Sequence, residues 1–219
     1  MNLDWSVVWQ YRGALAEGAL MTVVLSLATM VVAIPGGILL ALMRLSRSRI
    51  ASTASACFVE FFRNLPILLL VYWAYYVMPV ALDLRLSGFV TGLVALSLNV
   101  SAYNAETFRA GIGSLRKGQM EAAMALGMSR WQAMREVILP QASRRVLPVL
   151  ASTWVSLFKD TSLVSVIAVG ELAYTAMRIR SQTFRVLEML TAMAAIYWAL
   201  GYPQAKLTDW LNRRFGVTE

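Results

Sequence analysis

The sequence predicts an all-α protein that crosses a membrane about five times. Of its 219 residues, 58% are hydrophobic and 15% are charged, which is more apolar than an ordinary soluble domain. Residues 18–43 carry no charge, and a helix of that length can cross about 30 Å of hydrocarbon at about 1.5 Å per residue. We therefore expect a single transmembrane domain over residues 1–219.

The long apolar segments define the expected spans. The first begins after Asp4 and Glu17 rather than after a basic leader. It is also too long for the core of a signal peptide, so we expect it to be retained. A pair of charges, Lys159-Asp160, interrupts the fourth segment. In chain order, the expected spans are about 18–43, 52–80, 86–110, 141–170 and 188–211.

Proline is concentrated in these apolar segments. All six prolines lie inside a segment or at its end, namely Pro35, Pro66, Pro79, Pro140, Pro148 and Pro203. Proline removes a backbone donor and clashes with the preceding turn, so it kinks or breaks a helix unless neighbours satisfy the freed carbonyl. Broken helices suit a moving pathway, although proline is also common in membrane helices generally.

Basic residues predict the orientation of the chain. One set of connections holds most of them: Arg44, Arg47, Arg49, Arg116, Lys117, Arg130, Arg135, Arg144, Arg145, Arg213 and Arg214. Cytoplasmic loops carry the excess of Lys and Arg, so we expect the N-terminus outside and the C-terminus in the cytoplasm. The net charge of +8 is then mainly a topology signal, and a nucleic-acid partner is not expected.

A polar segment, about 112–140, separates the third and fourth expected spans. Apolar residues recur in it every three or four positions: Met120, Met124, Gly127, Trp131, Met134 and Ile138. This spacing predicts one apolar stripe along a helix. Because the segment is too polar to enter lipid, we expect a cytoplasmic loop that docks on another protein or folds back under the membrane domain. The alternative is an amphipathic helix lying on the lipid surface.

Charged pairs occur at membrane depth. Glu60 and Arg63 are one turn apart near the start of the second span, and Glu106 and Arg109 repeat this spacing near the end of the third. Opposite charges at this spacing partly neutralise each other. Ionisable groups within a membrane usually face a cavity, a bundle interior or a partner, which makes them candidates for function.

Catalytic signatures are weak in this chain. The sequence has no histidine and a single cysteine, which excludes histidine-based triads, H-E-x-x-H sites and thiolate metal clusters. Ser156 and Lys159 match S-x-x-K, but the S-D-N and K-T-G partners of that motif are absent. No lysine is followed by Ser or Thr as in a P-loop. If ATP drives this protein, another chain binds it.

Four motifs resemble those of a known family. Glu121-Ala122-Ala123, Gly127 and Leu139-Pro140 resemble the EAA loop of permease subunits of bacterial ATP-binding-cassette (ABC) importers, with Val137 where the family prefers Ile. The stretches 60–66, 103–112 and 159–163 are similar to the polar amino acid uptake branch. Residues 43–46 and 125–128 are most similar to glutamate/aspartate permeases. The resemblance covers residues 15 to 212.

The resemblance implies a fold, partners and a coupling site. It implies a type I ABC importer fold in the bacterial inner membrane, with two ATP-binding subunits that hold ATP and Mg, a second permease subunit that is identical or related, and an extracytoplasmic solute-binding protein. This chain itself would bind no cofactor or metal and would not be an enzyme. The implied ATPase-coupling residues are Glu121, Ala122, Ala123, Gly127, Met128, Leu139 and Pro140.

An amino acid in transit needs donors for its carboxylate and acceptors for its ammonium group. The candidate pathway residues are Asn99, Tyr103, Glu106, Lys159, Asp160, Thr161 and Ser162. Glutamate or aspartate is the first expected substrate, and basic or amide amino acids are the next. Three other classes stay open: a self-contained secondary transporter or channel, a serine enzyme built on Ser156, and a scaffold that recruits an ATPase without transport. The absence of a detectable internal repeat argues against the first of these.

Overall fold

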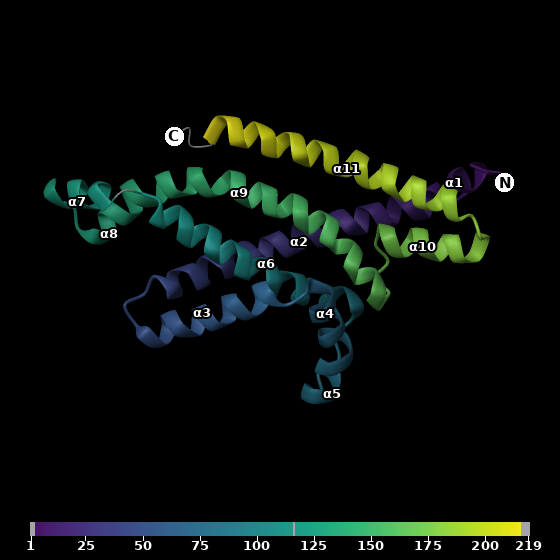
Figure 1. Ribbon diagram of the computed structural model, residues 1–219, viewed down its shortest axis with the longest axis horizontal. Coiled ribbons are helices and arrows are strands. Elements are labelled where there is room, and N and C mark those ends of the chain that lie inside the picture. The colour runs from purple at the N-terminus through teal and green to yellow at the C-terminus, as the bar shows by residue number, and fades with distance from the viewer. Residues whose placement is uncertain (1–2, 116, 216–219) are drawn as a thin grey trace.

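The computed structural model describes residues 3–115 and 117–215, and within these ranges every regular element is helical. The elements extend along one long axis (Figure 1). In order they are α1 Ser6–Gln10, α2 Arg12–Arg44, α3 Arg49–Asn64, α4 Ile67–Tyr72, the π-helix η1 Trp73–Val77, α5 Met78–Leu82, α6 Gly88–Gly113, α7 Lys117–Ala125, α8 Arg130–Gln132, the π-helix η2 Ala133–Ile138, α9 Leu139–Asp160, the 3₁₀-helix η3 Thr161–Ile167, α10 Leu172–Thr183 and α11 Val186–Phe215.

Helix α2 is long and apolar enough to cross a membrane by itself. Two bent pairs meet the same requirement together: α3 with residues 67–82, and residues 130–167 with α10. The described residues thus hold between one and three segments that satisfy length and composition alone. Helices α6 and α11 are long as well, at 26 and 30 residues, but several positions that face neighbouring helices are polar. Five crossings therefore stay a prediction.

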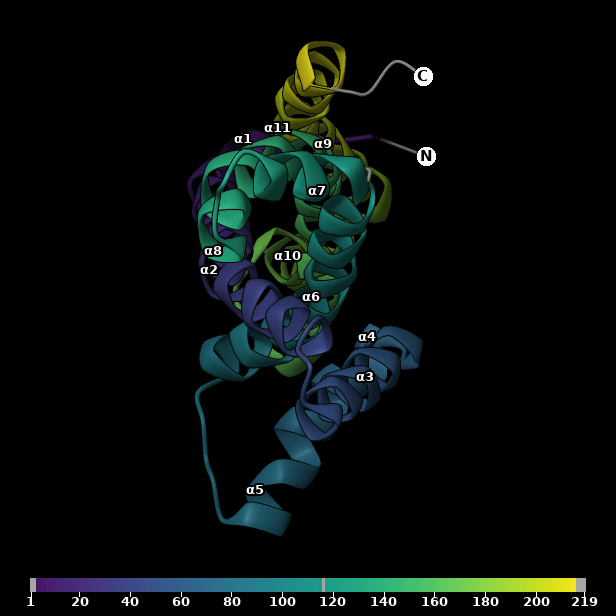
Figure 2. The same ribbon diagram turned by 90° about the vertical axis from the view of Figure 1, so that its left-hand side faces the viewer.

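The second expected span, 52–80, is not one straight helix. Helix α3 ends at Asn64 and α4 begins at Ile67, and their axes differ by 104°. The ring of Pro66 disfavours helical dihedrals for the residue before it, and Leu65 accordingly adopts extended backbone angles. Figure 2 shows α5, beyond this break, projecting away from the other helices. The sharp break agrees with the expectation that proline interrupts these segments.

Two further prolines follow π-helical turns. Helix η1 ends two residues before Pro79, and η2 ends two residues before Pro140. A proline has no N–H to donate to the carbonyl four residues earlier. That carbonyl belongs to Tyr75 in the case of Pro79 and to Glu136 in the case of Pro140. In a π-helical turn each carbonyl bonds to the N–H five residues on, so the donor lies beyond the proline. The chain thereby continues as a helix past both prolines.

The basic connections gather at one end of the long axis. The turn between α2 and α3, the α7–α8 region and the end of α11 lie at one end, while α1 and α10 lie at the other (Figure 1). Arg116, one of the residues that predicted this side to be cytoplasmic, lies outside the described residues. The positions of the two termini relative to the membrane stay a prediction.

Helices α2 and α6 form the most extensive contact in the molecule. A Cβ atom added at Gly36 would lie 2.5 Å from Oγ of Ser101, and one added at Gly37 would lie 2.5 Å from Cβ of Asn104. At Gly37 the added atom would also lie 3.1 Å from backbone atoms of Asn104 and Ala105, so the two backbones approach closely there, whereas at Gly36 the Ser101 side chain occupies the space. Small residues at such contacts are typical of helix packing in membranes.

Candidate functional site

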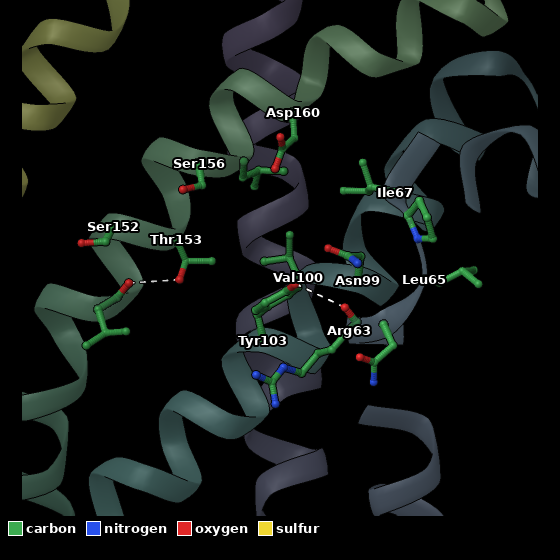
Figure 3. Close-up of a pocket in the computed structure, with 14 residues that line it drawn as sticks. Arg63, Leu65, Ile67, Asn99, Val100, Tyr103, Ser152, Thr153, Ser156 and Asp160 are labelled. Atoms are coloured by element: carbon green, nitrogen blue, oxygen red, sulfur yellow. Dashed lines mark hydrogen bonds between the residues drawn. The ribbon is translucent and has the colours of Figure 1, made fainter. Parts of the chain in front are cut away.

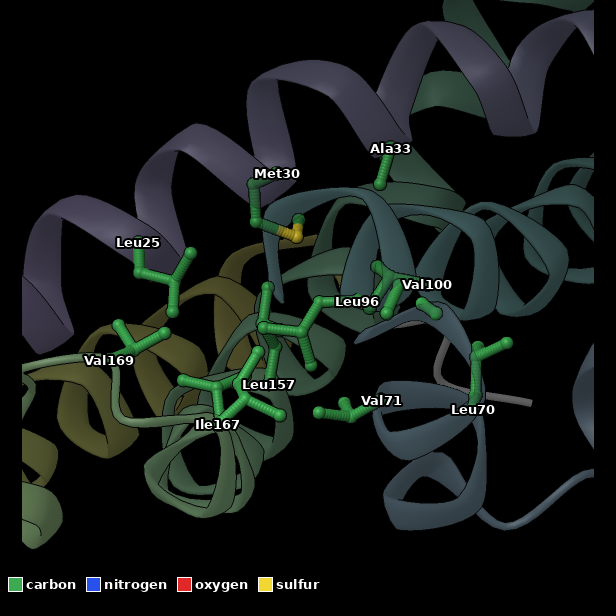
Figure 4. Packing of buried hydrophobic residues seen from close by; sticks show 13 residues of the cluster. Leu25, Met30, Ala33, Leu70, Val71, Leu96, Val100, Leu157, Ile167 and Val169 are labelled. Carbon is green, nitrogen blue, oxygen red and sulfur yellow. The ribbon is translucent and has the colours of Figure 1, made fainter. Parts of the chain in front are cut away.

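A cleft of about 660 Å³ lies between α6, α9 and the break after α3 (Figure 3). Its lining residues are Arg63, Asn64, Leu65, Pro66, Ile67, Asn99, Val100, Tyr103, Val149, Ser152, Thr153, Ser156, Leu157 and Asp160. Two of them, Val100 and Leu157, also belong to the main buried core, where residues of α2, α4, α6, α9 and η3 meet (Figure 4). The floor of the cleft is thus the packed core of the protein.

The cleft brings together three of the predicted pathway residues, Asn99, Tyr103 and Asp160. Asn99 Nδ2 donates to the carbonyl of Phe62 at 2.8 Å, and the Tyr103 hydroxyl donates to the carbonyl of Arg63 at 3.4 Å. Both bonds reach the last turn of α3, just before the proline break. The two α6 side chains therefore position the rim of the cleft as well as line it.

A row of polar side chains on α9 completes the cleft. Ser152, Ser156 and Asp160 follow each other at intervals of four residues and all line it, as side chains on one helix face do. The two serines are not among the predicted pathway residues, although their spacing from Asp160 in the sequence could have indicated them. Figure 3 shows Asp160 at the opposite end of the cleft from the Arg63 side chain, which lies over the Tyr103 ring at 5.4 Å.

A second cleft, of about 920 Å³, continues along the same two helices. Val149 lines both clefts, so together they form one groove between α6 and α9, which we call the α6–α9 groove. The predicted pathway residue Glu106 lies in this second part, where Arg109 Nη2 approaches its carboxylate at 2.7 Å. At the far end, Arg145 Nη1 donates to the hydroxyl and to the carbonyl of Ser114, both at 2.8 Å.

Three predicted pathway residues do not enter this groove. Lys159 lines a separate cleft between α9 and α11, together with Tyr197 and Trp198. Thr161 is fully buried and its hydroxyl donates to the Phe158 carbonyl at 2.7 Å. Ser162 donates to the carbonyl of Lys159 at 2.8 Å. The last two hydroxyls satisfy carbonyls at the end of α9, a role that the linear sequence does not distinguish from a pathway role.

The positions of Ser156 and Lys159 test whether the S-x-x-K motif could be catalytic. Ser156 faces the α6–α9 groove, whereas Lys159 lines the cleft on the side of α11. A lysine activates a serine nucleophile through hydrogen-bond contact. Because the two side chains line different clefts, the structure does not support a serine enzyme.

The polar segment 112–140 is interrupted between α7 and α8, and α8 continues through η2 into α9. Helix α7 ends at Ala125 and α8 begins at Arg130, with Gly127 between them at φ +84°. The prediction of one continuous apolar stripe is therefore wrong. Nothing would lie within 4 Å of a Cβ atom at Gly127, so glycine is favoured there by its left-handed backbone and not by a close approach. We call α7, this turn and α8 the α7–α8 hairpin.

Half of the expected stripe packs within the chain. Met120 and Met134 contact a small cluster formed by Leu115, Ile138 and Ala142, which attaches the hairpin to the ends of α6 and α9. Of the other members, Met124 and Trp131 face outward, at 42% and 71% exposed, and Leu126, which was not part of the predicted stripe, is 85% exposed beside the turn. The hairpin is thus anchored on one side and uncovered on the other.

The predicted coupling residues are distributed over both sides of the hairpin. Glu121, Ala122, Leu139 and Pro140 are exposed, Met128 is half-buried, and Ala123 is buried. The carbonyl of Ala123 accepts the Met128 N–H at 3.1 Å, which closes the turn around Gly127. The exposed members are accessible to a partner, while Ala123 and Met128 support the turn.

The chain combines long apolar helices, a polar groove and an uncovered hairpin at one end. This combination is typical of a membrane permease that functions together with partner subunits. Residues 33–217 match the family described as the binding-protein-dependent transport system inner membrane component. The chain belongs to this family. Its members are membrane subunits of ABC transporters, and the ATPase is a separate subunit. The chain is accordingly a transport subunit and not an enzyme.

Similar proteins cover nearly the whole chain. The "Glutamine transport system permease protein GlnP" of Escherichia coli (strain K12) is 37% identical over 99% of this chain and 100% of its own length. The "Glutamate/aspartate import permease protein GltK" of Escherichia coli O6:H1 is 34% identical over 97% of this chain and 98% of its own. A crystal structure of an amino acid ABC transporter with histidines matches at a TM-score of 0.92 and 33% identity, covering 98% of this chain and 100% of that one.

Proposed function

We propose that this chain is the permease subunit of an ATP-driven importer for a polar amino acid. The observation that carries the proposal is the α6–α9 groove, which runs from Asp160 to the helix ends that hold the α7–α8 hairpin. A solute path and an element suited to a partner are thus built on the same two helices. The relatives named for amino acid transport support the class of solute.

The groove matches the groups that all amino acids share. Asp160 supplies an acceptor for the α-ammonium group, and Ser156 supplies a hydroxyl donor for the α-carboxylate. The Ser152 hydroxyl already donates to the Pro148 carbonyl at 3.2 Å. Arg63, at the other end of the cleft, adds a cationic donor. Charge-assisted hydrogen bonds of this kind are stronger than neutral ones, and a desolvated zwitterion requires them.

The proposal also extends to the side chain of the transported amino acid. The two relatives quoted above are named for glutamine and for glutamate/aspartate, which differ in carrying an amide or a carboxylate. Acidic amino acids are our first expectation, and basic or amide amino acids are the next. A panel that contains all three classes distinguishes them.

The uncovered side of the α7–α8 hairpin is the proposed contact with the ATPase. Leu126 and Trp131 offer apolar surface, and Glu121 is exposed on α7. In this proposal two ATP-binding subunits, which hold ATP and Mg, lie against this end, with the C-terminus on the same side of the membrane. A second permease subunit, identical or related, completes the pathway. The solute-binding protein delivers the amino acid at the opposite end, where α1 and α10 lie.

The proposal is tested by uptake of radiolabelled amino acids into proteoliposomes that contain the complete complex and its binding protein. Asp160→Asn should lower kcat/KM for uptake about 100-fold, because one charged hydrogen bond contributes about 3 kcal/mol. Asp209→Asn, which changes an exposed aspartate on α11, should transport normally. Equal transport by the two variants would remove Asp160 from the path, and uptake without ATP would indicate a secondary transporter.

A further inference from the structure

The two walls of the α6–α9 groove are connected to the α7–α8 hairpin in different ways. The hairpin lies at the end of both helices (Figure 1). Helix α8 continues without a gap through η2 into α9, whereas α6 ends at Gly113 and α7 begins only at Lys117. Rigid helices and packed contacts carry a displacement from one site to another. The backbone alone therefore links the hairpin more directly to α9 than to α6.

Arg145 of α9 joins the two walls at the hairpin end of the groove. Its Nη1 atom donates to the hydroxyl and to the carbonyl of Ser114, the C-cap residue of α6, both at 2.8 Å. The Ser114 hydroxyl in turn donates to the carbonyl of Gly111 at 2.9 Å. A basic side chain is favourable at the carbonyl end of a helix, and a charged donor makes a stronger bond than a neutral one. One guanidinium group thus attaches the last turn of α6 to α9.

Packing contacts lie beside these hydrogen bonds. A Cβ atom added at Gly111 would overlap Cγ2 of Val146, the residue that follows Arg145. One turn earlier on α9, Ala142 packs with Leu115 in the cluster that supports the hairpin. Val146 and Ala142 are both buried. We call the contacts of Arg145 and Val146 with Ser114 and Gly111 the α6–α9 joint.

We propose that Arg145 is a positioning residue for transport, which makes α6 follow α9 when the ATPase displaces the α7–α8 hairpin. With the joint in place, the two walls move together at the hairpin end, and the groove changes width at its other end, near Asp160. Without the joint, α9 moves alone and the groove widens at the hairpin end. This inference rests on the proposed coupling role of the hairpin.

The test measures uptake and ATP hydrolysis in the same proteoliposomes, which contain the complete complex and its binding protein. In Arg145→Gln, the number of amino acid molecules taken up per ATP should fall about fivefold, as expected for one charged hydrogen bond at a partly exposed site, while hydrolysis continues. Arg144→Gln is the matched control, because Arg144 is the exposed neighbour that does not line the groove. An equal fall in both variants, or no fall in Arg145→Gln, would overturn the proposal.

Ser114 provides a variant on the other side of the joint. Ser114→Ala removes one of the two acceptors and leaves the backbone carbonyl, so the same ratio should fall about twofold. The double variant should be no worse than Arg145→Gln alone, because both changes break one contact. Additive losses would mean that Arg145 acts elsewhere, for example on the solute, and would contradict the joint. If Arg145→Gln does not assemble on size-exclusion chromatography, a normal ratio in Ser114→Ala contradicts it.

The wild type separates this inference from the proposed function. If the wild-type complex shows no ATP-dependent uptake, the importer itself is contradicted. If the wild type takes up amino acids with ATP and Arg145→Gln uses ATP equally well, only the role of the α6–α9 joint is contradicted.

Discussion

The two ends of the molecule differ in whether their side chains have partners within the chain. At the end formed by α1, α10 and the start of α11, polar groups find partners within the chain. At the end formed by the α7–α8 hairpin, large apolar groups lie uncovered. The difference indicates that polar contacts within the chain hold the first end together, whereas the uncovered apolar groups of the second end are suited to contact with another protein.

Glu171 is the centre of the polar contacts at the first end. Its side chain is fully buried and caps α10 by accepting the N–H groups of Ala173 and Tyr174 at 2.8 and 2.6 Å. It also accepts the hydroxyl of Tyr197 on α11 at 2.9 Å. Thr22 of α2 accepts the Leu172 N–H at 3.1 Å. These hydrogen bonds link three helices that are far apart in the sequence.

The N-terminal residues make polar contacts at the same end of the molecule. The backbone N–H of Asp4 donates to the Glu188 carboxylate at 2.9 Å. The hydroxyl and the backbone N–H of Ser6 donate to the Asp4 carboxylate, and these bonds hold the pKa of Asp4 below its usual value. The N-terminal segment is thus attached to α11 through polar contacts.

The hairpin end has little internal support by comparison. Its own cluster holds three buried residues, Leu115, Ile138 and Ala142, whereas Trp131 and Leu126 protrude from a segment too polar to lie in lipid. Exposed apolar groups of this kind in an aqueous setting mark a protein interface. Variants at the two ends should therefore fail in different assays.

The largest effect is expected at Glu171. Glu171→Ala removes an acceptor shared by three donors and should lower the free energy of unfolding by about 3 kcal/mol, because buried donors without partners are costly. Glu171→Gln should cost less, since its amide oxygen still accepts. The measurement is unfolding of the purified subunit in a denaturing-detergent titration. Glu17→Ala, which changes an exposed glutamate of α2, is the control, and an equal loss there would contradict a specific role for Glu171.

The next effect is expected at Trp131. Trp131→Ala should leave the stability of the isolated subunit unchanged but weaken its binding to the ATPase by about 2 kcal/mol, or about thirtyfold in Kd, as for an aromatic anchor in an interface. Binding of purified ATPase to the permease in nanodiscs measures this. Trp198→Ala removes an equally exposed tryptophan, 69% accessible, from α11. If that control weakened binding as much, the hairpin would not be the docking element.

The smallest effect is expected at Gly127. Gly127→Val places a β-branched residue at φ +84° and should strain the turn by about 1–2 kcal/mol. The uncovered side of the hairpin would then be misplaced, and ATP hydrolysis should respond less to substrate while the complex still assembles. Gly118→Ala, within α7 and with open space around its Cβ position, should retain the normal response. A normal response of Gly127→Val would show that the turn geometry is not needed for coupling.

Some of these features can be predicted from the sequence, and others cannot. The all-helical class and the break at Pro66 follow from composition and local sterics, which act over short distances. The hairpin stripe was predicted as one helix because spacing alone does not show that Gly127 reverses the chain. Asp160 was singled out by its charge, whereas Lys159 beside it faces another cleft, because consecutive helix residues point in different directions. The sequence does not predict the role of Glu171, since its three donors come together only in the folded chain.

The most direct test of the account is ATP hydrolysis by the complex, purified from native membranes and reconstituted in lipid with its binding protein. A panel of acidic, amide and basic amino acids is compared for the wild type and Glu121→Lys, which reverses the charge of an exposed residue on α7. The account predicts that one class of amino acid stimulates hydrolysis in the wild type and that Glu121→Lys loses the stimulation. If no ATPase subunit copurifies, or if hydrolysis is indifferent to every amino acid, the account of a coupled amino acid importer is contradicted.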